Sequence, residues 1–124
     1  MYEIMIETGF SASHLVRGYP GDCAQPHGHN WKVRVYVRAD RTNNLGMVID
    51  FRRLKEITQE RTEQLDHRSL NNFSPFAKEN PTSENVARWL YGNLREKIDA
   101  ADYYLWAVEV FETETNRVLY TERE

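Results

Sequence analysis

Cysteine is scarce in this sequence, since Cys23 is the only one among 124 residues. A lone thiol cannot form a disulfide within the chain, which excludes a secreted scaffold held by disulfides and favours a reducing compartment. An excess of charge is also missing, because 16 basic residues nearly balance 19 acidic ones and leave a formal net charge of −3. That balance gives no reason to expect nucleic acid or an anionic membrane as a partner.

Long apolar runs are missing as well. No stretch approaches the roughly 20 consecutive apolar residues that a membrane-spanning helix needs. The first ten residues, MYEIMIETGF, contain Glu3 and Glu7 and lack the basic flank and the continuous apolar centre of a signal peptide. We therefore expect a cytoplasmic protein without a membrane partner, and the length predicts a single domain over residues 1–124.

Alternating apolar and polar residues predict four strands. The predicted strands span residues 2–10, 29–39, 104–112 and 117–122. The second strand has the clearest apolar face, formed by Trp31, Val33, Val35 and Val37. The third strand is expected to bury Tyr104, Trp106, Val108 and Val110.

Two segments between the second and third strands predict helices. The first, residues 50–65, begins with Asp50 as a candidate N-cap, and the second, residues 82–98, begins with Thr82 or Ser83. The order β-β-α-α-β-β indicates an α+β fold, in which an antiparallel four-stranded sheet carries two helices on one face. The other face remains polar and uncovered, and its open strand edges favour association with further copies of the chain.

Histidines gather near the start of the second strand, in the stretch CAQPHGHNW. His27 and His29 are two residues apart, so a strand points both imidazoles to the same side. If the first two strands form a hairpin, His14 lies beside them and supplies a third ligand. Catalytic zinc commonly takes three protein ligands and leaves one position open, although packed or solvated histidines would also explain the pattern.

Four further residues carry candidate chemistry. Cys23 lies in a loop and is a possible fourth ligand, a base or nucleophile beside an open site, or a small buried apolar residue. Asp66 and His67 form a possible acid–base pair, although an exposed pair of this kind often has no function. Glu112 ends the apolar face of the third strand, where it reaches solvent or accepts paired N–H groups from a ligand.

Five motifs occur in order: FSASH, CxxxHGHN, LDHRSLN, NPTSENVA and ETETNRVLY. With these motifs the whole chain resembles the 6-pyruvoyltetrahydropterin synthase superfamily, and within it the bacterial 6-carboxy-5,6,7,8-tetrahydropterin synthases of the early queuosine pathway. The resemblance implies zinc on His14, His27 and His29. It also implies that Cys23, Asp66 and His67 are catalytic, and that Glu112 holds the pterin ring with Thr82 and Ser83 beside it.

The resemblance further implies a fold and an assembly. In the tunnelling fold of this superfamily, three subunits close a barrel and two barrels stack into a homohexamer, which would use the uncovered sheet face and its open edges. The implied reaction converts 7,8-dihydroneopterin triphosphate to 6-carboxy-5,6,7,8-tetrahydropterin, acetaldehyde and triphosphate, with zinc as a Lewis acid. Arg17, Lys32 and Arg68 are possible partners of the triphosphate, and no motif selects among them.

Three alternatives remain open. One is the 6-pyruvoyl enzyme of biopterin synthesis, which only eliminates triphosphate. Against it stand the three-residue gap between Cys23 and His27, the segment ENPTSE and the segment MVIDF, all of which resemble the bacterial carboxy enzymes more. The second is a non-catalytic zinc-binding oligomer with Cys23 as the fourth ligand. The third is a folate-pathway relative, in which a glutamate would stand near the position of Cys23.

Overall fold

The computed structural model describes residues 1–124 apart from the side chain of Cys23. Its elements are β1 (Tyr2–His14), η1 (Asp22–Ala24), β2 (His27–Ala39), α1 (Phe51–Thr62), β3 (Arg68–Ser69), η2 (Leu70–Asn72), η3 (Ser74–Phe76), α2 (Ser83–Ile98), β4 (Tyr104–Thr113) and β5 (Asn116–Tyr120). The α+β class and the order of the long elements are as predicted. The short strand β3 and the three 3₁₀ turns were not predicted.

The sheet has the strand order β3-β1-β2-β4-β5. The four longer strands pair antiparallel, as predicted, and β3 adds a short parallel pairing to β1 at Ala12 and Ser13. β1 continues beyond residue 10, where it was predicted to end, and reaches His14. In the long hairpin of β1 and β2 the register places His14 opposite His27, so the predicted meeting of the two strand ends is confirmed.

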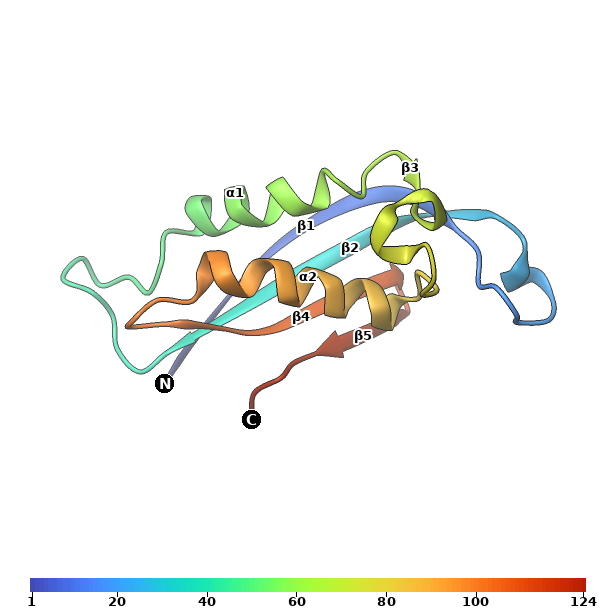
Figure 1. The fold of residues 1–124 in the computed structure, drawn as a ribbon. Coiled ribbons are helices and arrows are strands. Elements are labelled where there is room, and N and C mark those ends of the chain that lie inside the picture. The colour runs from blue at the N-terminus through green and yellow to red at the C-terminus, as the bar shows by residue number, and fades with distance from the viewer.

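Both long helices cover the same face of the sheet, α1 over β1 and α2 over β4 and β5 (Figure 1). Asp50 caps α1, because its carboxylate accepts a hydrogen bond from Arg52 N at 2.8 Å. Thr82 caps α2 through Asn85 N at 3.1 Å, which makes Ser83 the first residue of the helix. Val86, Leu90, Leu94 and Ile98 recur every four residues along α2 and form its buried face.

The hydrophobic core lies between the helices and the inner face of the sheet. Trp31, Val33, Val35 and Val37 of β2 are all buried there, as predicted. Leu54 of α1 and Leu90 of α2 pack against this core and are fully buried. Each such side chain contributes about 1.5–3 kcal/mol by leaving water, which holds the helices on this face.

The predicted inner face of β4 is wrong in its first half. Leu105, rather than Trp106, is buried in the core. Trp106 lies on the outer face, with the guanidinium of Arg38 3.5 Å from the centre of its ring, and Tyr104 pairs with Arg38 on the same face. A β-bulge causes the change, because it adds one residue to β4 at this point and reverses the alternation. From Val108 onward the predicted face is correct.

The outer face of the sheet is polar, as predicted, and carries no helix among the described residues. Its charges pair across strands: Arg34 Nε contacts Glu7 at 2.8 Å, and Tyr36 donates to the buried Glu109 at 2.5 Å. Among the described residues, the outer edge of β5 and most of the outer edge of β1 have no partner strand. Across the part of the chain that is described, no helix combines the length and the apolar character that crossing a membrane requires.

Candidate metal centre and active site

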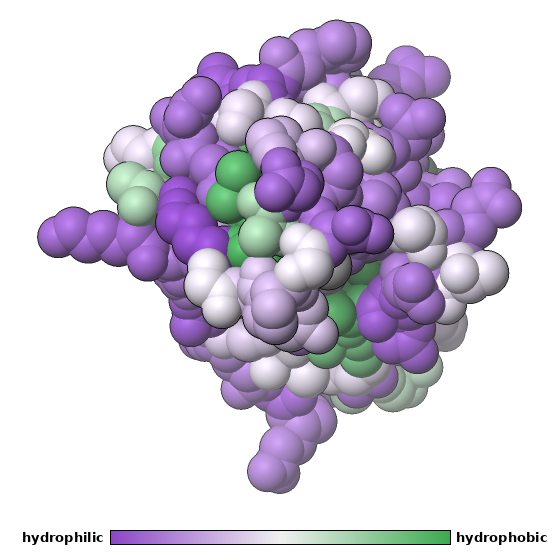
Figure 2. Space-filling view, turned by 90° about the vertical axis from the view of Figure 1, so that its right-hand side faces the viewer, coloured by the Kyte–Doolittle hydropathy of each residue, from purple (hydrophilic) through white to green (hydrophobic). Residues whose placement is uncertain are grey.

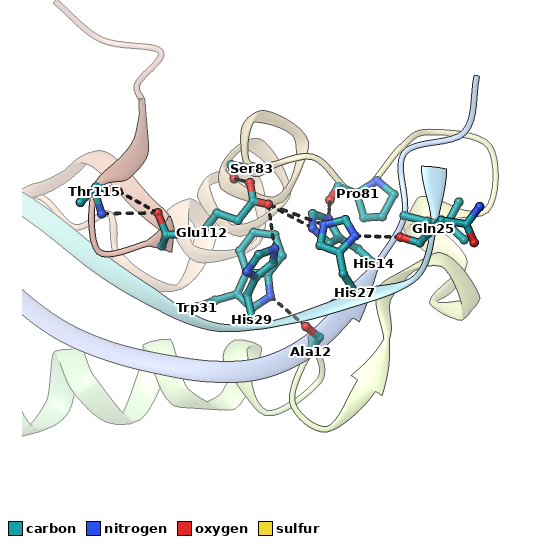
Figure 3. A network of polar contacts seen from close by, with 12 residues as sticks. Ala12, His14, Gln25, His27, His29, Trp31, Pro81, Ser83, Glu112 and Thr115 are labelled. Carbon is teal, nitrogen blue, oxygen red and sulfur yellow. Dashed lines mark hydrogen bonds and ion pairs between the residues drawn. The ribbon is translucent and has the colours of Figure 1, made fainter. Parts of the chain in front are cut away.

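Three histidines meet at one end of the sheet. His14 ends β1, and His27 and His29 open β2, all on the side that the helices cover. The ring centroid of His14 lies 4.5 Å from that of His27 and 5.3 Å from that of His29. The carboxylate of Glu112 joins them, and one potential ligand atom from each of the four residues lies within 4.8 Å of the others (Figure 3).

Backbone carbonyls fix the orientation of two of these imidazoles. His14 Nδ1 lies 2.7 Å from the carbonyl oxygen of Pro81, and His27 Nδ1 lies 2.8 Å from that of Gln25. A carbonyl oxygen only accepts, so each Nδ1 carries the proton and each Nε2 presents a lone pair. Proteins commonly orient metal-binding imidazoles in this way.

The Nε2 atoms face one another without hydrogen bonds of their own. His14 is only 3% exposed, and its Nε2 and that of His29 are buried without a hydrogen-bond partner. Glu112 Oε1 lies 2.9 Å from His29 Nε2 and 3.3 Å from His14 Nε2, but neither contact is aligned as a hydrogen bond. Leaving a buried polar atom unpaired costs about 1–3 kcal/mol. A metal ion bound to these lone pairs would remove that cost, so the residues fit a metal.

The chemistry of the donors narrows the choice of metal. Three neutral imidazoles with a further open position suit zinc. Burial lowers the pKa of His29, although the neighbouring Glu112 opposes the shift, so the ring favours the neutral form that binds metals. The ring edges of His14 and His29 rest on Trp31, which is 2% exposed and donates its Nε1–H to the carbonyl of Ala12. Contact with the buried Trp31 ring restricts the positions of both imidazoles.

Glu112 stands beside the cluster, at the end of the inner face of β4. Its Oε2 accepts a hydrogen bond from Ser83 Oγ at 3.2 Å, and Ser83 is 7% exposed. The structure therefore brings Glu112 and Ser83, two of the three residues expected at the pterin site, to the histidines. Thr82 lies next to Ser83, but its hydroxyl accepts the hydrogen bond that caps α2.

Asp66 and His67 form the expected pair in an unusual backbone conformation. Asp66 Oδ2 lies 2.8 Å from His67 Nδ1, and Asp66 Oδ1 accepts from Ser11 N at 2.8 Å. The backbone N–H of Ser11 and then the His67 side chain hold the pKa of Asp66 below its ordinary value. His67 has a φ of 55°, a left-handed conformation that is uncommon outside glycine.

This pair does not lie with the histidine cluster of the same chain. The side chain of His67 is 81% exposed and lines a hollow of about 530 Å³ together with Ser11, Ser13 and Asn30, and His29 is the one residue of the cluster that also lines it. Ser11 and Ser13 alternate along β1 with Ala12 and His14, so the hollow opens on the opposite face of the sheet. The assignments made to Cys23 fall on a side chain outside the described residues.

The three candidate cations have different surroundings. Arg17 donates to the carbonyl of Phe76 at 2.7 Å, Lys32 lies over the ring of Phe111, and Arg68 lines the hollow beside His67. The surroundings of these three side chains do not select one of them as the partner of the triphosphate.

Figure 2 shows the end of the molecule that carries the site, where the surface is mostly hydrophilic with small hydrophobic patches.

Comparison with known proteins decides the family. The family model described as 6-pyruvoyl tetrahydropterin synthase matches residues 3–123. The chain belongs to the 6-pyruvoyl tetrahydropterin synthase family.

Three relatives illustrate the range of the 6-pyruvoyl tetrahydropterin synthase family around this member. A 6-carboxy-5,6,7,8-tetrahydropterin synthase from Synechocystis is 38% identical, over 97% of this chain and 93% of its own. Human 6-pyruvoyl tetrahydrobiopterin synthase is also 38% identical, over 81% of this chain and 70% of its own. The solved structure of 6-pyruvoyl tetrahydropterin synthase from Caenorhabditis elegans superposes with a TM-score of 0.84 at 28% identity, covering 98% of this chain and 96% of that one. The chain is therefore an enzyme of this family, and the fold expected from the motifs is confirmed.

Several residues at the site had no predicted role. The carbonyl of Pro81 orients His14, and the side chains of Asn71 and Asn80 bind the backbone just after His14. Both asparagines stand in motifs that carried the resemblance, LDHRSLN and NPTSENVA. Their presence in those motifs was the available signal, whereas a backbone carbonyl leaves no trace in residue type.

Proposed function

We propose that this enzyme is a zinc-dependent lyase that converts 7,8-dihydroneopterin triphosphate to 6-carboxy-5,6,7,8-tetrahydropterin, acetaldehyde and triphosphate. Its place would be the cytoplasmic biosynthesis of queuosine and related 7-deazaguanines. The observation that carries the proposal is the set of three imidazoles whose Nε2 atoms converge, two of them buried and unpaired. The name of the Synechocystis relative supports the choice of product.

The residues around the cluster have distinct roles in this proposal. Zinc bound to His14, His27 and His29 would act as a Lewis acid on the hydroxyls of the substrate side chain. Glu112 accepts N–H groups of the pterin ring, because a carboxylate offers two acceptor oxygens to paired donors. Ser83 orients that carboxylate through its hydrogen bond to Oε2, and Thr82 extends the polar surface beside the ring.

Proton transfer falls to the remaining residues. Asp66 fixes the proton of His67 on Nδ1, so His67 Nε2 is the atom that exchanges a proton with substrate. Cys23, as a thiolate, moves a proton on the other side of the substrate side chain. Elimination then releases triphosphate. Water adds to the side-chain carbonyl next to the ring, and retro-aldol-like cleavage of the bond to the next carbon leaves the carboxylate on the pterin and releases acetaldehyde.

The position of His67 bears on the assembly. Within one chain His67 is not among the residues whose ligand atoms converge, and it lines a hollow to which His29 is the only cluster residue that contributes. We therefore propose that His67 serves the site of a neighbouring chain, in a homohexamer made of two trimers. The unpaired edges of β1 and β5 offer backbone hydrogen bonds for that assembly.

Product analysis tests the proposed reaction. The zinc-loaded protein is incubated with 7,8-dihydroneopterin triphosphate, the pterins are identified by mass, and the volatile product is trapped. Acetaldehyde together with 6-carboxytetrahydropterin is the expected result. Triphosphate release with accumulating 6-pyruvoyltetrahydropterin would assign the chain to the biopterin reaction instead. That outcome is worth testing because the human 6-pyruvoyl tetrahydrobiopterin synthase and the Synechocystis relative are both 38% identical to this chain.

A second measurement excludes a non-catalytic zinc protein. If Cys23 were a fourth zinc ligand, its thiolate would resist alkylation in the metal-loaded protein and become reactive when zinc is removed. The proposed role predicts the opposite, a thiol that reacts with iodoacetamide while zinc is bound. Zinc content is measured on the same sample after alkylation.

A further inference from the structure

Two asparagine side chains hold the backbone immediately after the candidate ligand His14. Asn71 Oδ1 accepts from Leu15 N at 2.9 Å, and Asn71 Nδ2 donates to Leu15 O at 3.1 Å. Asn80 repeats the arrangement on Arg17, with 2.9 Å for the accepted bond and 3.0 Å for the donated one. Each amide therefore satisfies both backbone groups of one residue, as a neighbouring strand would, just where β1 has ended.

The segment that contains Asn80 also touches the metal cluster directly. Asn80 is followed by Pro81, whose carbonyl accepts from His14 Nδ1 at 2.7 Å. Ser83, two residues further on, donates to Glu112. Asn85 Nδ2 in turn donates to the carbonyl of Asn80 at 2.8 Å and fixes the start of this segment against α2. The segment that contains Asn80 and Pro81 thus makes two kinds of contact with this region. Pro81 binds the ring of His14, and Asn80 binds the backbone that follows His14.

A third contact secures the same segment. Arg17 Nη2 donates to the carbonyl of Phe76 at 2.7 Å, which ties the chain after His14 to η3. From there the chain runs through the exposed residues 18–22 toward Cys23 and returns to His27. Contacts that fix the backbone of Leu15 and Arg17 therefore fix the position of the candidate ligand His14. They also fix the start of the loop that leads to Cys23.

We infer that Asn71 and Asn80 are positioning residues of the metal centre, which set the direction of His14 Nε2 through the backbone of Leu15 and Arg17. The inference rests on the proposed function for the identity of the metal. Partners outside the ligand sphere that orient a ligand typically change metal affinity 10–100-fold when they are removed. Neither asparagine contacts the position of the metal, so their effect acts through His14.

Zinc affinity is the first test, measured by competition with a chromophoric chelator for Asn71→Ala and Asn80→Ala. The matched control is Asn43→Ala, which also loses two hydrogen bonds to backbone, from Leu45 N and Met47 N, in the loop at the far end of the sheet. We expect the dissociation constant to rise at least about tenfold in the two test variants and to stay within about twofold in the control. Equal affinities in all three variants would overturn the inference.

Limited digestion with trypsin gives a readout that needs neither zinc nor turnover. Cleavage after Arg17 requires local opening of the segment that the two amides hold, so the rate follows the free energy of that opening. In metal-free protein we expect cleavage at Arg17 at least about fivefold faster in Asn71→Ala and Asn80→Ala than in Asn43→Ala. Unchanged rates in both test variants would contradict the proposed role.

The two tests also separate this inference from the proposed function. If the unaltered protein binds no zinc, the proposed function fails, and cleavage at Arg17 alone then decides whether the amides hold the segment. If zinc binds but no product forms, the affinities still decide the inference. Where an alanine variant does not fold, Asn71→Ser or Asn80→Ser replaces it, since a serine hydroxyl cannot bind both backbone groups of the residue it faces.

Discussion

The three imidazoles are not equivalent in their surroundings, yet each is required if zinc is held by all of them. Replacing His27 or His29 with alanine leaves two protein ligands, too few for the tetrahedral sites that zinc prefers. We therefore expect purified His27→Ala and His29→Ala to contain less than about a tenth of the zinc of the unaltered protein. Elemental analysis after dialysis measures this, and full zinc in both variants would eliminate the site.

Glu112 differs from the histidines because its carboxylate has a second possible use. It lies 2.9 Å from His29 Nε2, yet Ser83 holds its other oxygen, which suits a group that receives the pterin. We expect Glu112→Gln to keep its zinc and to lose at least about tenfold in kcat/KM, since a charged hydrogen bond is worth about 1.5–3 kcal/mol and the amide presents a mismatched donor. Loss of zinc comparable to that in His29→Ala would instead make Glu112 a ligand.

Asp66 links the acid–base pair to the stability of the fold. Its pKa is lowered in the folded protein, chiefly by the N–H of Ser11, so its contribution is present above the ordinary value of 3.8 and is lost as the pH falls through the lower folded value. The free energy of unfolding should therefore be larger for the unaltered protein than for Asp66→Asn near neutral pH. The difference between the two should shrink below about pH 4. Urea unfolding at a series of pH values measures it, and a difference independent of pH would contradict the assignment.

At the scale of the elements, the hairpin of β1 and β2 determines the geometry of the metal centre. A Cβ at Gly9 would lie only 2.6 Å from the carbonyl oxygen of Trp31, whereas at Gly28 the nearest atom, Ala12 O, is 4.0 Å away. We expect Gly9→Ala to lower the free energy of unfolding by about 2 kcal/mol, because the two strands must separate to admit the methyl group. Gly28→Ala should change it by less than about 0.5 kcal/mol, and unfolding at equal protein concentration compares the two.

Local periodicity made much of this hairpin predictable. Alternation along β2 predicts its buried face, and pairing of neighbouring strands predicts that His14 lies beside His27, as the structure has it. The bulge at Trp106 was not predictable, because it depends on how that ring packs with Arg38 and Tyr36 on another strand. The contacts of Pro81 and Asn80 with the segment after His14 join residues more than sixty positions apart, and a residue pattern cannot reveal such pairings.

At the scale of the whole molecule, the described residues leave one face of the sheet, the outer edge of β5 and most of the outer edge of β1 without partners. Charged pairs such as Arg34 with Glu7 cover the outer face, which tolerates water or another copy equally well. Large apolar side chains, by contrast, are exposed near the β1 edge, where Met5 and Phe51 border a groove. Their exposure fits a chain that associates with copies of itself, as the proposed hexamer requires.

Complementation between two inactive variants tests whether one site draws on two chains. His29→Ala lacks an intact metal cluster but keeps His67, and His67→Ala has the reverse defect. If His67 serves a neighbour, co-expressed chains carrying different tags should regain about a quarter of the normal activity at equal mixing, because half of the sites have an intact cluster and half of those meet an intact His67. Tandem affinity purification isolates the mixed oligomers, and light scattering checks that they have the mass of a hexamer.

Each variant purified alone is the control and should remain inactive. If mixed oligomers form and stay as inactive as the controls, the cluster and His67 must act within one chain, and the assignment of His67 to a neighbouring site is wrong.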